Sequence, residues 1–195
     1  MTDRNTKKTQ GTTSRRRFLK TSGVIAGAAA GLSIARSAHA AGSEGYLNLA
    51  LIGCGGRGTG AVANAFDADP RTRLVAMADA FEDRLQTSLT NLKKRAPDRV
   101  LVDKSTSFVG FDAYQKAIEA DVDVVLLATP PHFRPIHLKA AIEAGKHVFC
   151  EKPVAVDAPG IRSVLQTSEL AAQKGLSLVS GLCWRYHTAT RETIQ

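Results

Sequence analysis

The feature that most constrains the fold of this chain is a glycine run at residues 53–58, which reads Gly-Cys-Gly-Gly-Arg-Gly. Glycine occupies its first, third and sixth positions, the spacing of the pattern G-x-G-x-x-G. An apolar segment, Leu47–Ile52, comes directly before the run. A segment with helical periodicity, Gly58–Phe66, begins at its last glycine. This order predicts a strand, a tight turn and a helix.

From Tyr46 onward the chain alternates short apolar segments with helical ones, which is typical of an α/β fold with a doubly wound, Rossmann-type parallel sheet. We expect further strands at Leu74–Ala78, Val100–Val102, Val122–Ala128, His147–Cys150 and Leu176–Leu182. Helices are expected between them, at about 82–95, 112–119, 136–144 and 157–174. Asp157 is a good N-cap for the last of these helices, with Pro159 in its first turn.

Between a strand and a helix, the glycine run has the context of a dinucleotide-binding loop. Gly53 permits the tight turn, Gly55 lets a pyrophosphate approach the backbone, and Gly58 lets the helix pack closely on the strand. The helix N-terminus offers unpaired N–H groups to the phosphates. We therefore predict a cofactor-binding loop that also includes Gly56 and Arg57.

Asp79 closes the second predicted strand, 21 residues after Gly58. An acidic side chain at this place accepts hydrogen bonds from the adenosine ribose hydroxyls. Its charge favours NAD over NADP, because a 2′-phosphate would lie beside an uncompensated carboxylate. NADP stays open as an alternative, since Arg57 or Arg84 could pair with that phosphate.

Two further motifs follow the fourth and fifth predicted strands. They are Thr-Pro-Pro-His at residues 129–132 and Glu-Lys-Pro at residues 151–153. Both lie at carboxyl ends of parallel strands, the edge where open α/β sheets bind ligands. With the glycine run and the phrase Ala-Gly-Lys-His-Val-Phe-Cys-Glu-Lys-Pro at residues 144–153, the chain resembles the Gfo/Idh/MocA family of oxidoreductases from about Leu47 to Arg185.

The resemblance implies an NAD(P)-dependent enzyme that transfers a hydride between the nicotinamide and a sugar, cyclitol or related polyol. It implies that Lys152 is the catalytic acid or base and that Glu151 holds the nicotinamide ribose. A lysine in a closed, partly desolvated site has a lowered pKa, which suits proton transfer at neutral pH. The resemblance further implies a homo-oligomeric full-length protein.

Other cofactor contacts follow from the same resemblance. Thr129 and Pro130 match the family and would line the ribose and nicotinamide, with His132 as a further pocket residue and Arg185 as a contact near the nicotinamide. Pro131 departs from the asparagine that many relatives carry, which removes a side-chain amide contact. Trp184 and Tyr186 are expected to be packing residues.

Family members continue into a second α+β domain that supplies substrate contacts. We therefore expect residues 41–156 to form the nucleotide-binding domain, and residues 157–195 to hold its last helix and strand and the start of a truncated substrate domain. The fragment alone is then expected to be inactive. Two other functions stay open: an NAD-dependent glycosidase that oxidises its sugar transiently, and a non-catalytic NAD-binding fragment.

The net charge of +8 is concentrated at the front of the chain. Residues 1–40 hold eight basic residues and one acidic residue, a net charge of +7, which leaves +1 for the other 155 residues. A nucleic-acid-binding domain carries its positive charge on the fold itself. The composition therefore argues against a nucleic-acid partner.

The first 40 residues have the order of an export signal. Arg15 and Arg16 stand in the sequence Ser-Arg-Arg-Arg-Phe-Leu-Lys, which is similar to a twin-arginine signal. A weakly apolar run, Gly23–Ile34, and the small-residue site Ala-His-Ala at 38–40 follow. The run is shorter than the roughly 20 residues of a membrane-spanning helix. We expect export to the periplasm by the twin-arginine machinery and no stable membrane span.

Three cysteines, Cys54, Cys150 and Cys183, are widely spaced and lie in apolar segments. This pattern favours buried thiols over a disulfide framework or a zinc site. We expect no metal.

Overall fold

A computed structural model describes residues 45–194 and shows a single sheet of six parallel strands in this part of the chain. The strands are β1 (Leu47–Ile52), β2 (Thr72–Asp79), β3 (Ser107–Val109), β4 (Val124–Leu127), β5 (His147–Cys150) and β6 (Leu178–Ser180). Their order across the sheet is β3-β2-β1-β4-β5-β6, which is that of the doubly wound dinucleotide-binding fold. The α/β prediction is confirmed.

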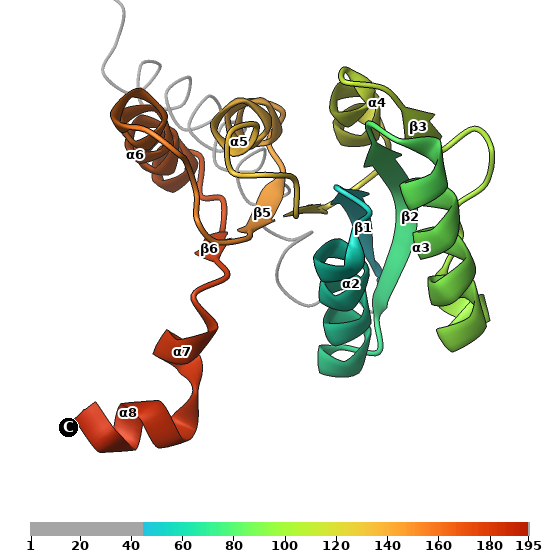
Figure 1. Cartoon of the computed structure of the whole chain (residues 1–195), viewed down its shortest axis with the longest axis horizontal. Helices are drawn as coiled ribbons and strands as arrows, with labels where there is room; N and C mark the ends of the chain where they lie inside the picture. Colours follow the sequence, from blue (N-terminus) through green and yellow to red (C-terminus); the bar gives the residue numbers. More distant parts are fainter. Residues whose placement is uncertain (1–44, 195) are drawn as a thin grey trace, which may run out of the picture. The chain divides into compact units, whose positions relative to one another are not determined.

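Helices cover both faces of this sheet (Figure 1). The helices are α2 (Gly56–Ala68), α3 (Glu82–Arg95), α4 (Ala113–Glu119), α5 (Arg134–Glu143), α6 (Ala158–Gln173), α7 (Cys183–Tyr186) and α8 (Thr188–Ile194), with a 3₁₀ turn η1 (Pro97–Arg99). Helices α2 and α3 lie on one face, and α4, α5 and α6 lie on the other. This arrangement makes the sheet the middle layer of three.

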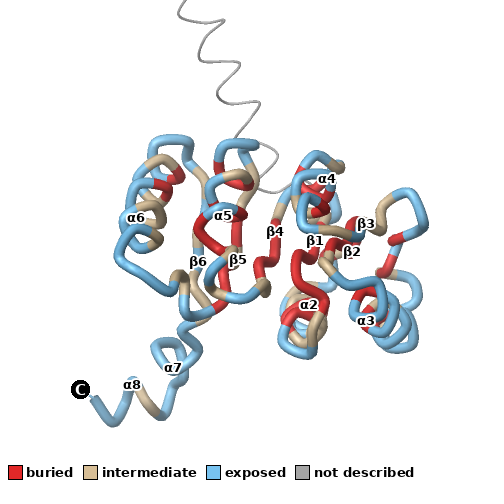
Figure 2. Tube along the Cα trace, turned by 45° about the horizontal axis from the view of Figure 1, so that its top comes forward, coloured by how far each residue is buried: buried red, intermediate tan, exposed pale blue. Residues whose placement is uncertain are grey.

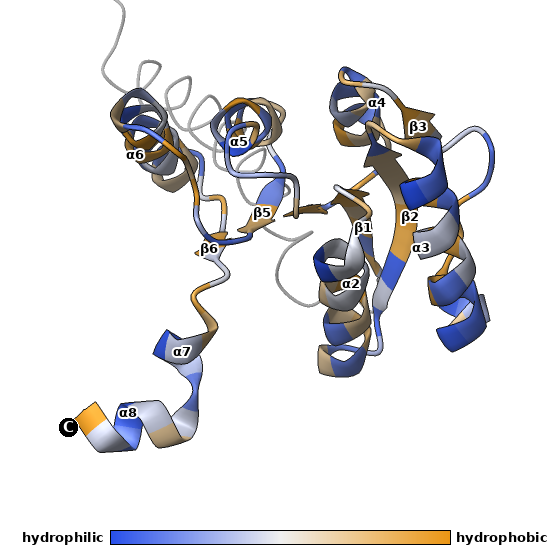
Figure 3. Ribbon diagram, in the orientation of Figure 1, coloured by the Kyte–Doolittle hydropathy of each residue, from blue (hydrophilic) through white to orange (hydrophobic). Residues whose placement is uncertain are grey.

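Each face of the sheet has its own apolar core. Leu51, Leu74 and Met77 pack against α2 and α3, and Ile52 and Val125 pack with α4 and α5 on the other side. Strands β1, β2 and β4 are accordingly buried along most of their length, whereas the edge strands β3 and β6 are not, and the outer faces of the helices are exposed (Figure 2). Figure 3 shows the same division in hydropathy, with apolar strands and a largely hydrophilic α3.

The third strand is not where the sequence predicts it. Val100–Val102 was the expected position, but β3 is Ser107–Val109, and Val100 makes only an isolated bridge to Leu74. Val100 and Val102 are nevertheless buried in the core on the α2 and α3 side. The prediction was wrong because burial in a loop gives the same apolar pattern as burial in a short strand.

The last helix on the second face begins as expected. The Asp157 side chain accepts a hydrogen bond from the Gly160 backbone N–H at 2.7 Å, and α6 carries its proline in the first turn. This cap satisfies one of the donors that every helix N-terminus leaves unpaired.

The end of the described chain corrects three expectations. Strand β6 covers only Leu178–Ser180, and residues 183–186 form helix α7. Cys183 is exposed, whereas Cys54 and Cys150 are buried free thiols as expected. Trp184 is 71% exposed and Tyr186 is also exposed, so neither is a packing residue in this part of the chain.

The predicted export signal at residues 1–40 lies outside the described residues. Within residues 45–194, no helix combines the length and the apolar character that crossing a bilayer requires.

Candidate functional site

Two glycines of the loop between β1 and α2 are required by the protein's own packing. Gly53 has a φ of +94°, and a Cβ there would lie 2.6 Å from the Thr129 backbone nitrogen. A Cβ on Gly58 would overlap the carbonyl oxygen of Gly53 and crowd Leu51. These two positions fix the turn and the close approach of α2 to the sheet, as predicted.

Packing within the described chain does not require glycine at positions 55 and 56. A Cβ on Gly55 or on Gly56 would meet no other atom of the described chain within 4 Å. Gly55 is the N-cap of α2 and provides no side-chain cap, so the first N–H groups of the helix stay available. The bare backbone at Gly55 therefore suits a ligand with negative charge that lies against it.

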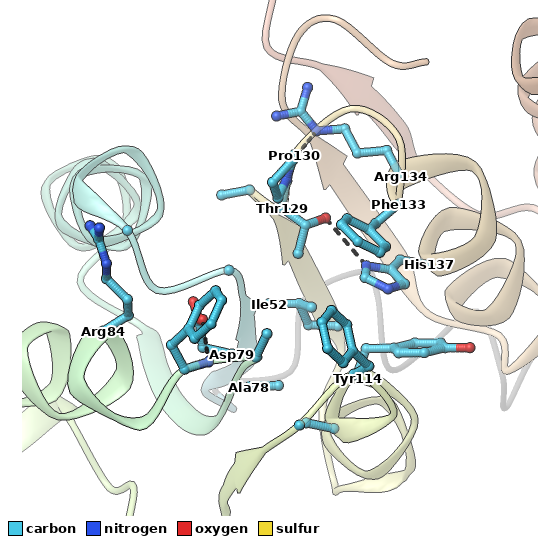
Figure 4. Close-up of a pocket in the computed structure, with 18 residues that line it drawn as sticks. Ile52, Ala78, Asp79, Arg84, Tyr114, Thr129, Pro130, Phe133, Arg134 and His137 are labelled. Carbon is cyan, nitrogen blue, oxygen red and sulfur yellow. Dashed lines mark hydrogen bonds between the residues drawn. The ribbon is translucent and has the colours of Figure 1, made fainter. Parts of the chain in front are cut away.

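A cavity of about 510 Å³ opens beside this loop, at the carboxyl ends of β1, β2 and β4. Figure 4 shows Asp79 and Arg84 on one side of it, Thr129, Pro130, Phe133, Arg134 and His137 on the other, and Ile52 with Ala78 at its floor. Gly53 and Gly55 also line it. The structure thus brings Gly53, Gly55, Asp79, Thr129 and Pro130 together, as the sequence predicts.

Asp79 lies at the end of β2 and is held by the backbone. One of its carboxylate oxygens accepts from the Cys54 N–H at 2.6 Å and the other from the Phe81 N–H at 2.9 Å. Each oxygen keeps a further lone pair, because a carboxylate has about four acceptor sites. The glycine loop and Asp79 are therefore fixed relative to each other, and Arg84 lines the same cavity.

Thr129, at the end of β4, is held from two sides by helix α5. Its carbonyl accepts from the Arg134 Nε at 2.8 Å, and its hydroxyl pairs with the His137 Nδ1 at 3.2 Å. The His137 ring stacks on Tyr114 with the ring centroids 4.1 Å apart. Burial lowers the pKa of His137 to about 4, so the imidazole is neutral at neutral pH.

Glu151 follows β5 and is 2% exposed. Its carboxylate accepts from the Arg57 Nε at 2.6 Å and also pairs with the Arg57 Nη2. Gly181 packs against it, since a Cβ there would lie 2.9 Å from the Glu151 Oε2. The structure therefore joins Glu151 to the glycine loop, a pairing that sequence reasoning did not foresee.

Lys152 and Arg185 lie together at a second hollow of about 440 Å³, which Gly181, Leu182, Cys183 and Trp184 also line. Lys152 is exposed, so the described residues do not supply the desolvation that was expected around its amine. His132 is also exposed, makes an edge contact with the Phe133 ring, and is not among the residues that line the 510 Å³ cavity.

Sequence reasoning missed Arg134 and His137. Both are buried, and both lie in the first turns of α5, which begins two residues before the predicted start at Ile136. The available signal was an arginine and a histidine close after the Thr-Pro turn, at the start of a helix that packs on the sheet.

The two buried cysteines, Cys54 and Cys150, are unreactive thiols. Burial raises the pKa of the Cys54 thiol strongly and that of Cys150 to about 11, so both stay protonated. Among residues 45–194, no group of three or more His, Cys, Asp or Glu side chains is arranged to hold a metal ion.

Comparison with known proteins places the chain in a family. Residues 47–181 match the Gfo/Idh/MocA family model, described as an oxidoreductase family with an NAD-binding Rossmann fold. A glycosyl hydrolase family 109 protein of Solibacter usitatus is 30% identical over 90% of this chain and 40% of its own length. Inositol 2-dehydrogenase of Serratia proteamaculans is 32% identical over 68% of this chain and 35% of its own length.

The fold comparison agrees. Scyllo-inositol dehydrogenase from Lactobacillus casei, solved with NAD(H) and scyllo-inositol, superposes with a TM-score of 0.58 at 23% identity, over 76% of this chain and 39% of that one. The chain spans about two fifths or less of the length of these proteins. By its sequence match and its strand order, the chain belongs to the Gfo/Idh/MocA family of NAD-binding oxidoreductases.

Proposed function

We propose that the protein is an NAD-dependent oxidoreductase that transfers a hydride to or from a sugar, cyclitol or related polyol. The proposal rests on Gly55. No atom of the described chain lies where its Cβ would be, so packing within the protein does not explain the missing side chain, and Gly55 lines the 510 Å³ cavity. Membership of an oxidoreductase family and the similarity to inositol 2-dehydrogenase support the reaction class.

The residues of the cavity fit a dinucleotide. The N–H groups at the start of α2, beside Gly55 and Gly56, would hold the pyrophosphate. The free lone pairs of Asp79 would accept from the adenosine ribose hydroxyls, and Thr129 with Pro130 would line the remainder. When bound, NAD supplies the hydride-accepting nicotinamide ring, and the protein supplies its position.

The reacting hydroxyl of the substrate would be handled by Lys152. An amine at this place can accept the hydroxyl proton at its Nζ during oxidation and return it during reduction. Lys152 is at the carboxyl end of β5 and shares its hollow with Arg185. The Glu151 carboxylate, held by Arg57, accepts a hydrogen bond from the Lys152 backbone N–H at 3.3 Å, which ties down the backbone from which Lys152 extends.

We infer a preference for NAD over NADP. The carboxylate of Asp79 would repel a 2′-phosphate, and Arg57 is engaged by Glu151. Arg84 is the cation on the cavity wall near Asp79 that could accommodate the phosphate. Calorimetric titration with both cofactors tests the inference, and equal affinities would remove Asp79 as the discriminating residue.

A second candidate function is an NAD-dependent glycosidase, which the similarity to the family 109 glycosyl hydrolase of Solibacter usitatus supports. Both reactions use the same glycine loop and Lys152. The experiment supplies NAD with myo-inositol in one assay and with an aryl glycoside in another. Net NADH formation from the polyol supports the dehydrogenase, and release of the aryl group without net NADH supports the glycosidase. If NAD binds stoichiometrically and neither polyol oxidation nor aryl glycoside cleavage is seen, the result supports a non-catalytic NAD-binding protein.

We also propose that the protein is exported by the twin-arginine route to the periplasm. The proposal rests on Arg15 and Arg16 and on the small-residue site at 38–40. Replacing both arginines by lysine is expected to leave the precursor in the cytoplasm. Cell fractionation and immunoblotting measure where the protein lies and whether it is processed. Normal processing of the double variant would contradict export by this route.

A further inference from the structure

Arg134 is a buried cation that forms no salt bridge with an acidic side chain among residues 45–194. It begins helix α5 and is 5% exposed. No carboxylate in the described part of the chain lies within ion-pair distance of it. Burying a charge costs free energy unless its N–H groups are hydrogen-bonded. The acceptors of this guanidinium therefore indicate its role.

Those contacts are backbone carbonyls on two different loops. The Arg134 Nε donates to the Thr129 carbonyl at 2.8 Å, after β4. Its Nη1 donates to the Glu151 carbonyl at 2.7 Å and to the Pro153 carbonyl, after β5. The two carbonyls on the second loop stand on either side of Lys152. One planar guanidinium therefore links the loop that lines the cavity to the loop that carries the proposed acid or base.

We propose that Arg134 is a positioning residue, which holds Lys152 at a fixed place relative to the Thr129 side of the cofactor cavity. This inference rests on the proposed function. The fork of guanidinium N–H groups has a rigid geometry, which a lysine ammonium lacks. A displacement of about 1 Å at a reacting group can lower a rate about 100-fold, so a fixed loop matters for catalysis.

The chain offers a matched control in Arg99, which lies in the 3₁₀ turn η1. The Arg99 Nε donates to the Thr72 carbonyl and its Nη1 to the Phe66 carbonyl, both at 2.8 Å, and its Nη2 donates to the Asp69 carbonyl at 2.6 Å. These carbonyls lie in the last turn of α2, at its C-cap and at the first residue of β2. Arg99 thus holds backbone in the same way without lining either hollow.

The test measures how well NAD shields Lys152 from acetylation, read by mass spectrometry on the full chain at saturating NAD. Lys139, an exposed residue of α5, is the internal reference. In the wild type we expect NAD to slow the labelling of Lys152 about tenfold relative to Lys139. In Arg134→Met we expect less than twofold protection, although NAD still saturates the protein by calorimetry. In Arg99→Met we expect a lowered Tm with the full tenfold protection.

Arg134→Lys keeps the charge but loses the planar fork, and it provides the test if Arg134→Met does not fold. We expect two- to fivefold protection in this variant. Wild-type protection in a folded Arg134 variant would overturn the positioning role and leave the proposed function standing. If NAD neither binds nor protects Lys152 in the wild type, the proposed function fails before any variant is compared.

Discussion

Packing requires glycine at position 58 but not at positions 55 and 56, and substitutions can measure this difference. A Cβ on Gly58 would overlap the Gly53 carbonyl oxygen, a backbone atom that cannot move without shifting the turn. We expect Gly58→Ala to lower the free energy of unfolding by about 3 kcal/mol, at the upper end of overpacking costs. Urea denaturation measures it. Gly56→Ala, which meets no atom within 4 Å, is the control and should stay within about 0.5 kcal/mol of the wild type. Equal stability of the two variants would contradict the close packing of α2 on the sheet.

His137 makes the stability of the fold depend on pH. Its pKa is lowered from 6.5 to about 4 by burial, so the unfolded chain binds more protons than the folded chain between these values. The full stability is therefore present above pH 6.5 and is lost as the pH falls toward 4. The expected loss is about 3 kcal/mol, from 1.4 kcal/mol for each unit of pKa shift.

Denaturation at several pH values between 4 and 8 measures this loss. His137→Gln cannot take up the proton and should be less pH-dependent across the same range. The Asp69 carboxyl, whose pKa is lowered to about 2 by its hydrogen bonds from Arg71, titrates below this window and does not interfere. A variant with the same pH dependence as the wild type would show that His137 is not the titrating group.

Between elements, the pair of Arg57 and Glu151 joins the start of α2 to the end of β5. The Glu151 carboxylate is buried, while the Arg57 side chain is 53% exposed. Breaking a fully buried pair costs about 3–5 kcal/mol, and solvent at the Arg57 side reduces this. We expect Arg57→Met to destabilise the fold by about 2 kcal/mol, and the double variant Arg57→Met/Glu151→Gln to recover most of that loss. Chemical denaturation of the four proteins completes the cycle. Strict additivity of the two single changes would contradict the pairing.

The elements themselves were largely predictable, and the two exceptions have physical reasons. β1, β5 and α3 match their expected bounds, because apolar runs flanked by turn residues and a helical period mark them clearly. Strand β3 was misplaced because Val100 and Val102 are core residues that lie in a loop. The segment after β6 was misjudged because Trp184 is apolar and aromatic and is nevertheless exposed.

At the scale of the whole molecule, the strand order assembles the site. Because β1 lies between β2 and β4, the glycine loop reaches Asp79 on one side and Thr129 on the other. Sequence spacing was enough to predict these residues, since each lies at or just after the carboxyl end of a strand. It could not predict the contacts of Arg57 with Glu151 or of Arg134 with three carbonyls. Those contacts depend on the distance between loops that are far apart along the chain.

The cavity beside the glycine loop is the proposed NAD site, with the pyrophosphate against Gly55. Calorimetric titration of NAD into the wild-type chain and into Gly55→Val tests this assignment. The Cβ of the new side chain would meet no atom of the described residues within 4 Å, so the fold should lose only about 1 kcal/mol through the weaker N-cap, and denaturation checks this. We predict that the wild type binds one NAD per chain and that Gly55→Val, still folded, shows no measurable binding. Equal affinity of the two proteins for NAD would contradict the account.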